Sequence, residues 1–162
     1  MSFGLLKKFR ESIFETFSNA VSHSRTKLGI FSCGQFFPRQ DLLDFTVADL
    51  GVGIRQNIRD FIGLDLSWEK AIVWATEGNS TTRQDNLPGG LGLKILCDFI
   101  DLNRGCLQIV SHGGYWRRRD SEIVTKPLSY PFPGTVVNIE INTADTNIYQ
   151  LTSEELNPDN IF

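Results

Sequence analysis

Apolar residues in the first quarter of the chain recur with two distinct periods. Residues 5–23 carry them at steps of three and four, which is typical of an amphipathic helix: Leu5, Leu6, Phe9, Ile13, Phe17, Ala20 and Val21. Two β-prone runs follow at residues 30–37 and 43–49, with the polar residues 38–41 between them. This pattern predicts a helix followed by a β-hairpin.

The rest of the chain alternates between short helical and strand-like patterns. Residues 54–61 and 68–75 are predicted as two helices separated by Gly63. Residues 77–90 are polar and without periodicity, so we expect a long loop, which in a compact domain is often a functional lid. Helical spacing returns at 91–102, and strands are expected at residues 106–111, 115–119 and 135–141.

This order of elements favours an α+β two-layer sandwich. We expect a mixed, mostly antiparallel β-sheet with the helices packed on one face. Strands and helices do not alternate throughout, which excludes a doubly wound fold. We place the folded domain at residues 1–142, and residues 143–162, rich in Asn, Asp and Glu, form an expected polar acidic C-terminal tail.

Length and charge narrow the function classes. The 162 residues suit one domain, and 16 Lys+Arg against 19 Asp+Glu give a net charge of −3. That balance makes nucleic acid an unexpected partner, although Arg117, Arg118 and Arg119 form a local basic cluster. We expect this cluster to be a solvated strand edge, with a contact to a partner or to nucleic acid as the alternative.

Nothing in the sequence indicates a membrane or an oxidising environment. No apolar run approaches the roughly 20 residues that span a bilayer, and the N-terminus lacks a secretory pattern. The three cysteines, Cys33, Cys97 and Cys106, lack CxxC spacing, so we expect buried, reduced thiols. We therefore expect a cytoplasmic protein.

The first chemical motif lies on the N-terminal helix. Glu15, Asn19 and His23 are four residues apart and form a polar line beside the apolar stripe. Such a line is usually a solvated helix face. The alternative is a carboxylate and an amide that hold a water molecule and a hydrated divalent cation.

The second motif, Asp49-Leu50-Gly51-Val52-Gly53, ends the second predicted strand. The glycines permit a tight turn and a close approach of the backbone to a flat ligand. The Asp49 carboxylate is well placed to accept a hydrogen bond from an exocyclic amine. A plain structural turn is the alternative.

The third motif, Gly89-Gly90-Leu91-Gly92-Leu93, joins the long loop to a helix. Backbone N–H groups and the helix N-terminus there favour an anion such as phosphate. The motif is neither a Walker A loop nor a Rossmann fingerprint, and a flexible loop meeting a helix is the alternative.

The three motifs together, in this order and with a Ser/Thr-rich loop between the second and third, resemble the GHKL (Bergerat-fold) ATP-binding superfamily. This superfamily includes gyrase, heat-shock chaperones, mismatch-repair ATPases and histidine kinases. Residues 15–24 resemble its N box, 49–53 and 89–93 its two glycine boxes, and 134–139 its closing Gly-Thr strand. The likeness covers roughly residues 8–142 and is greatest to the stand-alone histidine-kinase-like ATPase domain.

The resemblance implies a role for each motif residue. Asn19 would bind Mg²⁺, Asp49 would bond the adenine amino group with support from Thr135, and Glu15 would act as general base. Gly51 and Gly53 would let the base and ribose settle against the backbone. The phosphates would lie against one further group of residues, which comprises the second glycine box and the loop above it: Ser80, Thr81, Thr82, Gly89, Gly90, Leu91, Gly92 and Leu93.

Two departures from the family pattern limit this transfer of roles. Ser22 stands where many kinases of this group carry Lys or Arg, with Arg83 or Lys94 as substitutes elsewhere in the chain. Neither His23 nor His112 lies on an acceptor helix, so autophosphorylation in cis is not expected.

We therefore expect a module that binds ATP (or ADP) and Mg²⁺, and that hydrolyses ATP slowly or regulates a partner protein according to the bound nucleotide. One alternative is a kinase acting in trans, either an anti-sigma-like serine kinase or a histidine-kinase catalytic domain without its acceptor domain. Another is a non-catalytic interaction module. The sequence leaves the oligomeric state open, a homodimer included.

Overall fold

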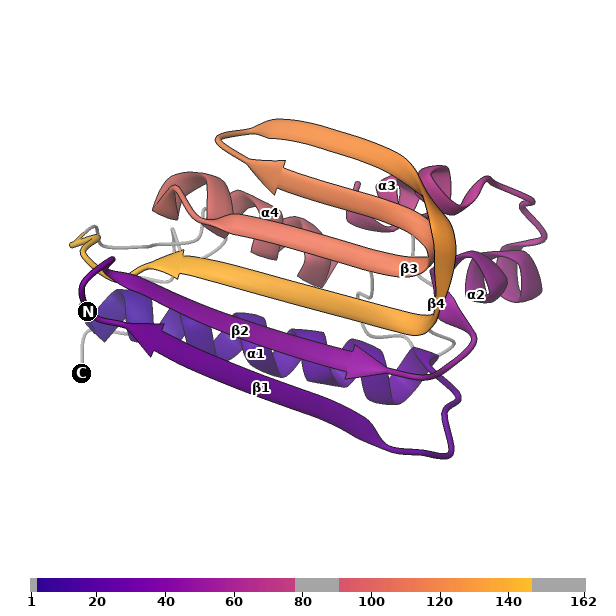
Figure 1. Cartoon of the computed structure of the whole chain (residues 1–162), viewed down its shortest axis with the longest axis horizontal. Coiled ribbons are helices and arrows are strands. Elements are labelled where there is room, and N and C mark those ends of the chain that lie inside the picture. The colour runs from indigo at the N-terminus through magenta and orange to yellow at the C-terminus, as the bar shows by residue number, and fades with distance from the viewer. Residues whose placement is uncertain (1–2, 78–90, 147–162) are drawn as a thin grey trace, which may run out of the picture.

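The computed structural model describes residues 3–77 and 91–146, which form two layers (Figure 1). Helices cover one face of a four-stranded sheet within these residues, so the expected α+β two-layer architecture is confirmed. The helices are α1 (Phe3–His23), α2 (Gly53–Ile62), α3 (Trp68–Thr76) and α4 (Leu91–Asn103). The strands are β1 (Ile30–Phe37), β2 (Leu42–Asp49), β3 (Cys106–Arg119) and β4 (Glu122–Asn142).

The strand order in the sheet is β1-β2-β4-β3. Every pairing among the described strands is antiparallel, so this part of the chain holds no parallel pair of the kind expected in a mixed sheet. The predicted β1–β2 hairpin is confirmed, with Phe37 opposite Leu42 and a tight turn closed by the Gln40 N–H, which donates to the Phe37 carbonyl at 3.0 Å. β4 then returns between β2 and β3, which makes it a central strand.

The β3–β4 hairpin is longer than the sequence indicated and is bent. Residues 106–111 and 115–119, predicted as separate strands, belong to one strand whose register shifts between Ser111 and Gly114. Both strands turn there, and the tip of the hairpin returns alongside the first half of β3 (Figure 1). No element was predicted for residues 122–134, which carry three prolines. Proline is tolerated there because residues 122–132 pair only with β3 among the described strands.

The bend brings the basic cluster back onto the domain. Arg118 pairs with Asp101 of α4 at 2.6 Å, and Arg119 pairs with Glu140 of β4. The side chains of Arg118 and Asp101 are only 22% and 19% exposed. The expectation of a solvated strand edge is therefore wrong for Arg118, which attaches the hairpin to α4.

The hydrophobic core lies between the helices and the sheet. It is built from α3, α4, β3 and β4, and its most buried members include Ile72, Leu96, Ile100, Leu107, Ile109, Trp116, Ile139 and Ile141. Phe45 of β2 extends it to α1 through edge and tilted contacts with Phe9 and Phe17. Successive strand residues point to opposite faces, so Asp49, an even number of residues after Phe45, also faces the helices.

Two further expectations concern the membrane and the thiols. Within the described residues, the structure contains no helix that is both long and apolar enough to cross a bilayer. Cys97 and Cys106 are buried and reduced, as expected. The expectation is wrong for Cys33, which is exposed because it lies opposite Thr46, on the face of the sheet away from the helices.

Candidate functional site

The carboxylate of Asp49 is buried where β2 ends. Only 4% of the residue is exposed, and Thr135 of β4 lies opposite it in the sheet. Its Oδ1 accepts a hydrogen bond from the Gly51 N–H at 2.8 Å. Burial raises the pKa of the Asp49 carboxyl above its usual value, while the backbone N–H groups of Gly51 and Thr135 and the nearby His112 oppose that shift.

A chain of hydroxyl groups runs beside this carboxylate. The hydroxyl oxygens of Thr135 and Ser111 are 3.2 Å apart, and Ser111 Oγ accepts from the Ile54 N–H at 2.9 Å. These contacts join β4 and β3 to the first turn of α2. Thr135 was predicted at the site from the family likeness, whereas Ser111 was missed because only the strand register places it beside Thr135.

The glycine turn after Asp49 is held by protein packing. The Val52 N–H donates to the Ser24 carbonyl at 2.9 Å, and a Cβ added at Gly51 would lie 2.0 Å from that same oxygen. Gly53 has a φ of +76°, and its added Cβ would lie 2.3 Å from the His112 ring. The two glycines form the expected tight turn, and their missing side chains make room for Ser24 and His112.

The glycine of the Gly-Thr motif is explained in the same way. Gly134 has a φ of +138°, and an added Cβ would lie 2.0 Å from the Asp49 carbonyl oxygen. This close approach lets β4 pass the end of β2 and places Thr135 beside Asp49.

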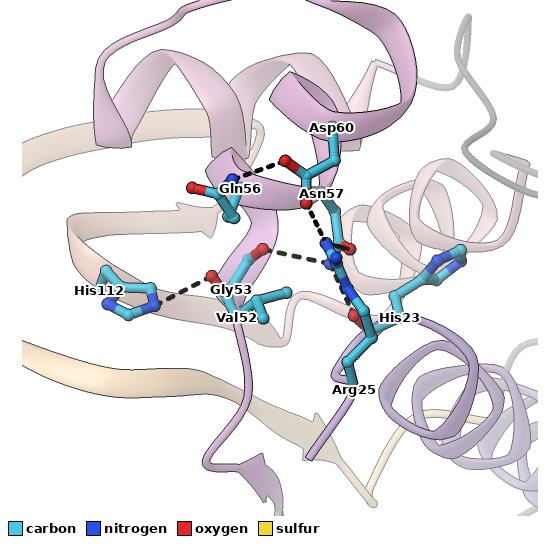
Figure 2. Close-up of polar contacts among 8 residues, drawn as sticks. All are labelled: His23, Arg25, Val52, Gly53, Gln56, Asn57, Asp60 and His112. Atoms are coloured by element: carbon cyan, nitrogen blue, oxygen red, sulfur yellow. Dashed lines mark hydrogen bonds and ion pairs between the residues drawn. The ribbon is translucent and has the colours of Figure 1, made fainter.

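A stack of planar side chains contacts the glycine turn of residues 51–53 through His112. Figure 2 shows His112 against Val52, whose carbonyl oxygen is 3.0 Å from His112 Nε2. Trp68 stacks on His112 with ring centroids 5.1 Å apart, and the Arg55 guanidinium lies 4.6 Å from the centroid of the Trp68 ring. Sequence reasoning missed these residues, since each carries no local signal for the contact.

A polar network joins the end of α1 to α2 (Figure 2). The buried Asn57 side chain contacts the His23 carbonyl, the Gly53 carbonyl and the Arg25 guanidinium. Arg25 also pairs with Asp60 at 2.7 Å. Hydrogen bonds from Arg25 and then Gln56 lower the pKa of the Asp60 carboxyl.

Glu15 and Asn19, the predicted functional residues of the N box, lie on α1 and are half-buried. Helix α1 packs against β2 through Phe9 and Phe17 and ends next to the glycine turn. Asn19 precedes Ser24 by five residues, or about 7.5 Å along a helix axis. The structure thus places Glu15 and Asn19 in the helical layer, on an element attached directly to the Asp49 turn.

The second glycine box is described only from its helical end. Leu91, Gly92 and Leu93 form the first turn of α4, which confirms the predicted helix start. Several predicted phosphate-binding residues lie outside the described residues: Ser80, Thr81, Thr82, Gly89 and Gly90.

Residues 3–77 and 91–146 contain no group of three His, Cys, Asp or Glu side chains that could hold a metal ion by itself. Glu15 and Asn19, the expected general base and Mg²⁺ ligand, lie one helical turn apart on α1. Comparison with known proteins found no protein-family model that matches this chain and no curated protein that matches its sequence.

Proposed function

We propose that this chain adopts a Bergerat-type fold and binds ATP (or ADP) together with Mg²⁺, and that it hydrolyses ATP slowly or regulates a partner protein according to the bound nucleotide. The observation that carries the proposal is the Asp49 carboxylate. It is buried on the helix-covered side of the sheet, oriented by the Gly51 N–H, and adjacent to the Thr135 hydroxyl.

Burying a carboxylate is unfavourable unless hydrogen bonds compensate for the lost water. Asp49 receives two backbone N–H groups, which leaves part of its accepting capacity for a ligand. The exocyclic amine of adenine is a donor and matches this acceptor. The corresponding oxygen of guanine is an acceptor, so binding of a guanine nucleotide would leave two acceptors facing each other.

The donors on α1 fit the other end of such a ligand. Mg²⁺ prefers oxygen ligands and is often bound by one or two protein groups together with substrate phosphates. Asn19 would contribute an amide oxygen, and Glu15 is the proposed proton acceptor for an attacking water. Bound Mg²⁺ would supply positive charge that stabilises the phosphates.

Calorimetric titration of the full chain with a non-hydrolysable ATP analogue and Mg²⁺ tests binding. We expect saturable binding that Asp49→Asn abolishes, with a GTP analogue at least about tenfold weaker. Asp44→Asn is the matched control because Asp44 is on the same strand but faces the opposite side of the sheet. Absence of binding by the unmodified chain would contradict the proposal.

Phosphate release tests the reaction separately. Glu15→Gln should reduce ATP turnover at least about 100-fold if Glu15 is the general base, whereas Glu11→Gln, one turn earlier on α1, should not. Unchanged turnover in Glu15→Gln would exclude that role. Labelled γ-phosphate found on a co-purified protein would indicate phosphotransfer in trans in place of hydrolysis. Partner binding of equal strength with and without nucleotide would favour a non-catalytic interaction module.

A further inference from the structure

The two halves of the proposed site lie on elements that are separate in sequence. Asp49 and the turn of residues 51–53 lie between β2 and α2, while Glu15 and Asn19 lie on α1. The β1–β2 hairpin occupies most of the chain between Ser24 and Asp49. The backbone therefore does not fix the distance between the two halves directly, and non-covalent contacts must do so.

Asn57 makes the central contact of this kind. Its Nδ2 donates to the His23 carbonyl at 2.7 Å and to the Gly53 carbonyl at 3.1 Å, and its Oδ1 accepts from Arg25 Nη2 at 2.8 Å. One buried amide is thus hydrogen-bonded to the last residue of α1, to the first residue of α2 and to Arg25, two residues beyond the end of α1. An aspartate at this position has no N–H to donate and would face two carbonyl oxygens.

Arg25 holds the amide from the other side. It has a φ of +53°, and this left-handed conformation turns the chain back toward α2. Its guanidinium pairs with Asp60 at 2.7 Å and lies 5.8 Å from the centroid of the Phe61 ring. Asp60 also accepts from Gln56 Nε2 at 2.6 Å, so two donors on one carboxylate fix the position of the Arg25 side chain (Figure 2).

A backbone contact completes the attachment. The Val52 N–H donates to the Ser24 carbonyl, and the spacing at Gly51 leaves no room for even a methyl group. The end of α1 and the glycine turn are therefore packed as one unit, and Asn57 is the side chain that bridges them.

We propose that Asn57, held by Arg25, is a positioning residue that couples Mg²⁺ binding on α1 to nucleotide binding at Asp49. This inference rests on the proposed function. With the bridge in place, a metal bound at Asn19 and a base bound at Asp49 are held at one separation, so each favours the other. Without it, each half still binds its own group but gains less from the other.

The test measures ATP affinity of the full chain with and without Mg²⁺. The ratio of the two dissociation constants reports the coupling between Mg²⁺ and the bound nucleotide, and typical couplings are about 5- to 150-fold. Asn57→Asp should lower that ratio at least about fivefold while changing the Mg²⁺-free affinity less than about threefold. Arg59→Gln, an exposed change on the same helix, is the matched control and should leave both values unchanged.

A second variant covers the case in which Asn57→Asp does not fold. Arg25→Asn retains a residue that tolerates positive φ, but its side chain is too short to reach Asn57 and Asp60. It should lower the coupling ratio in the same direction by a smaller factor. All titrations are made well below each variant's melting temperature, where a purely structural role for Asn57 would leave the ratio unchanged.

The outcomes separate the two proposals. If the unmodified chain binds no ATP, the proposed function fails and this inference fails with it. If the unmodified chain binds ATP and shows Mg²⁺ coupling, but both variants keep that ratio within twofold, only the role of Asn57 is overturned. Equal ATP affinity with and without Mg²⁺ in the unmodified chain also overturns it.

Discussion

Replacing Gly51 by alanine tests whether the turn after Asp49 is fixed by its packing against Ser24. The added Cβ would lie 2.0 Å from the Ser24 carbonyl oxygen, 2.6 Å from the carbonyl carbon and 2.8 Å from Asp49 Oδ1. Two of these three atoms belong to the backbone, so no side-chain rotation relieves the overlap. The turn itself must move away from α1.

The size of that movement sets the expected loss of stability. Ordinary contact begins near 3.4 Å, so the pair must separate by 3.4 − 2.0 = 1.4 Å. A shift of this size breaks the 2.9 Å hydrogen bond from the Val52 N–H to Ser24. Overpacking of about 1–3 kcal/mol and a lost hydrogen bond of about 1 kcal/mol give about 3 kcal/mol in all. For a domain of this size, that is a drop of about 6–12 °C in Tm.

Urea unfolding followed by circular dichroism measures this loss, with the slope m expected to stay constant. Gly63→Ala is the control, because Gly63 has a φ of +77° but no atom within 4 Å of an added Cβ. It should lose only the backbone strain of about 1 kcal/mol. If Gly51→Ala loses no more stability than Gly63→Ala, the packing argument is refuted.

Three further predictions concern titration and thiol reactivity. Burial raises the pKa of the Asp49 carboxyl, so the folded state loses stability as pH rises through that pKa. In urea unfolding at pH 7, Asp49→Asn should therefore be more stable than the unmodified chain. The difference in unfolding free energy between the two should shrink toward pH 4. A destabilised Asp49→Asn at pH 7 would contradict this. Arg118 lowers the pKa of Asp101, so Asp101→Asn should lose about 1 kcal/mol at pH 7, and the loss should disappear as pH falls through that lowered pKa. A thiol reagent at pH 8 should label Cys33 alone in the folded chain, because Cys97 and Cys106 are buried and burial raises the pKa of Cys97 to about 12. Rapid labelling of two thiols would show that Cys97 or Cys106 is not buried.

The elements predicted correctly from the sequence are those with strong local patterns. Helix α1 follows its three- and four-residue spacing, and the β1–β2 hairpin follows its polar turn at residues 38–41. The bent hairpin was only partly predicted, because residues 122–134 contain prolines that locally oppose a strand. Pairing with β3, the preceding strand of the same hairpin, makes residues 122–132 part of a strand, and their own proline-containing pattern does not indicate that pairing.

The candidate site likewise contains some residues that local motifs predict and others that only the packed structure reveals. Asp49 and Thr135 were predicted from motifs, and the structure places them opposite each other in the sheet. Ser111, His112 and Asn57 act through contacts with residues 24 to 60 positions away, so no local pattern marks them. The glycine turn was predicted from the motif, whereas the close approach of Ser24 and His112 to its glycines is revealed only by the packed structure.

The central position of β4 in the sheet has a consequence for how the chain acquires its site. Asp49 meets Thr135 only when a segment 86 residues later inserts between β2 and β3. Such non-local pairing is slow to form, so the site should appear with the last cooperative step of folding rather than with the early β1–β2 hairpin. A nucleotide bound there would slow unfolding of the whole sheet, and at 100 times its Kd would stabilise the fold by about 2.7 kcal/mol. Resistance to proteolysis would then rise with ligand concentration even at β1, the strand farthest from the β3 edge.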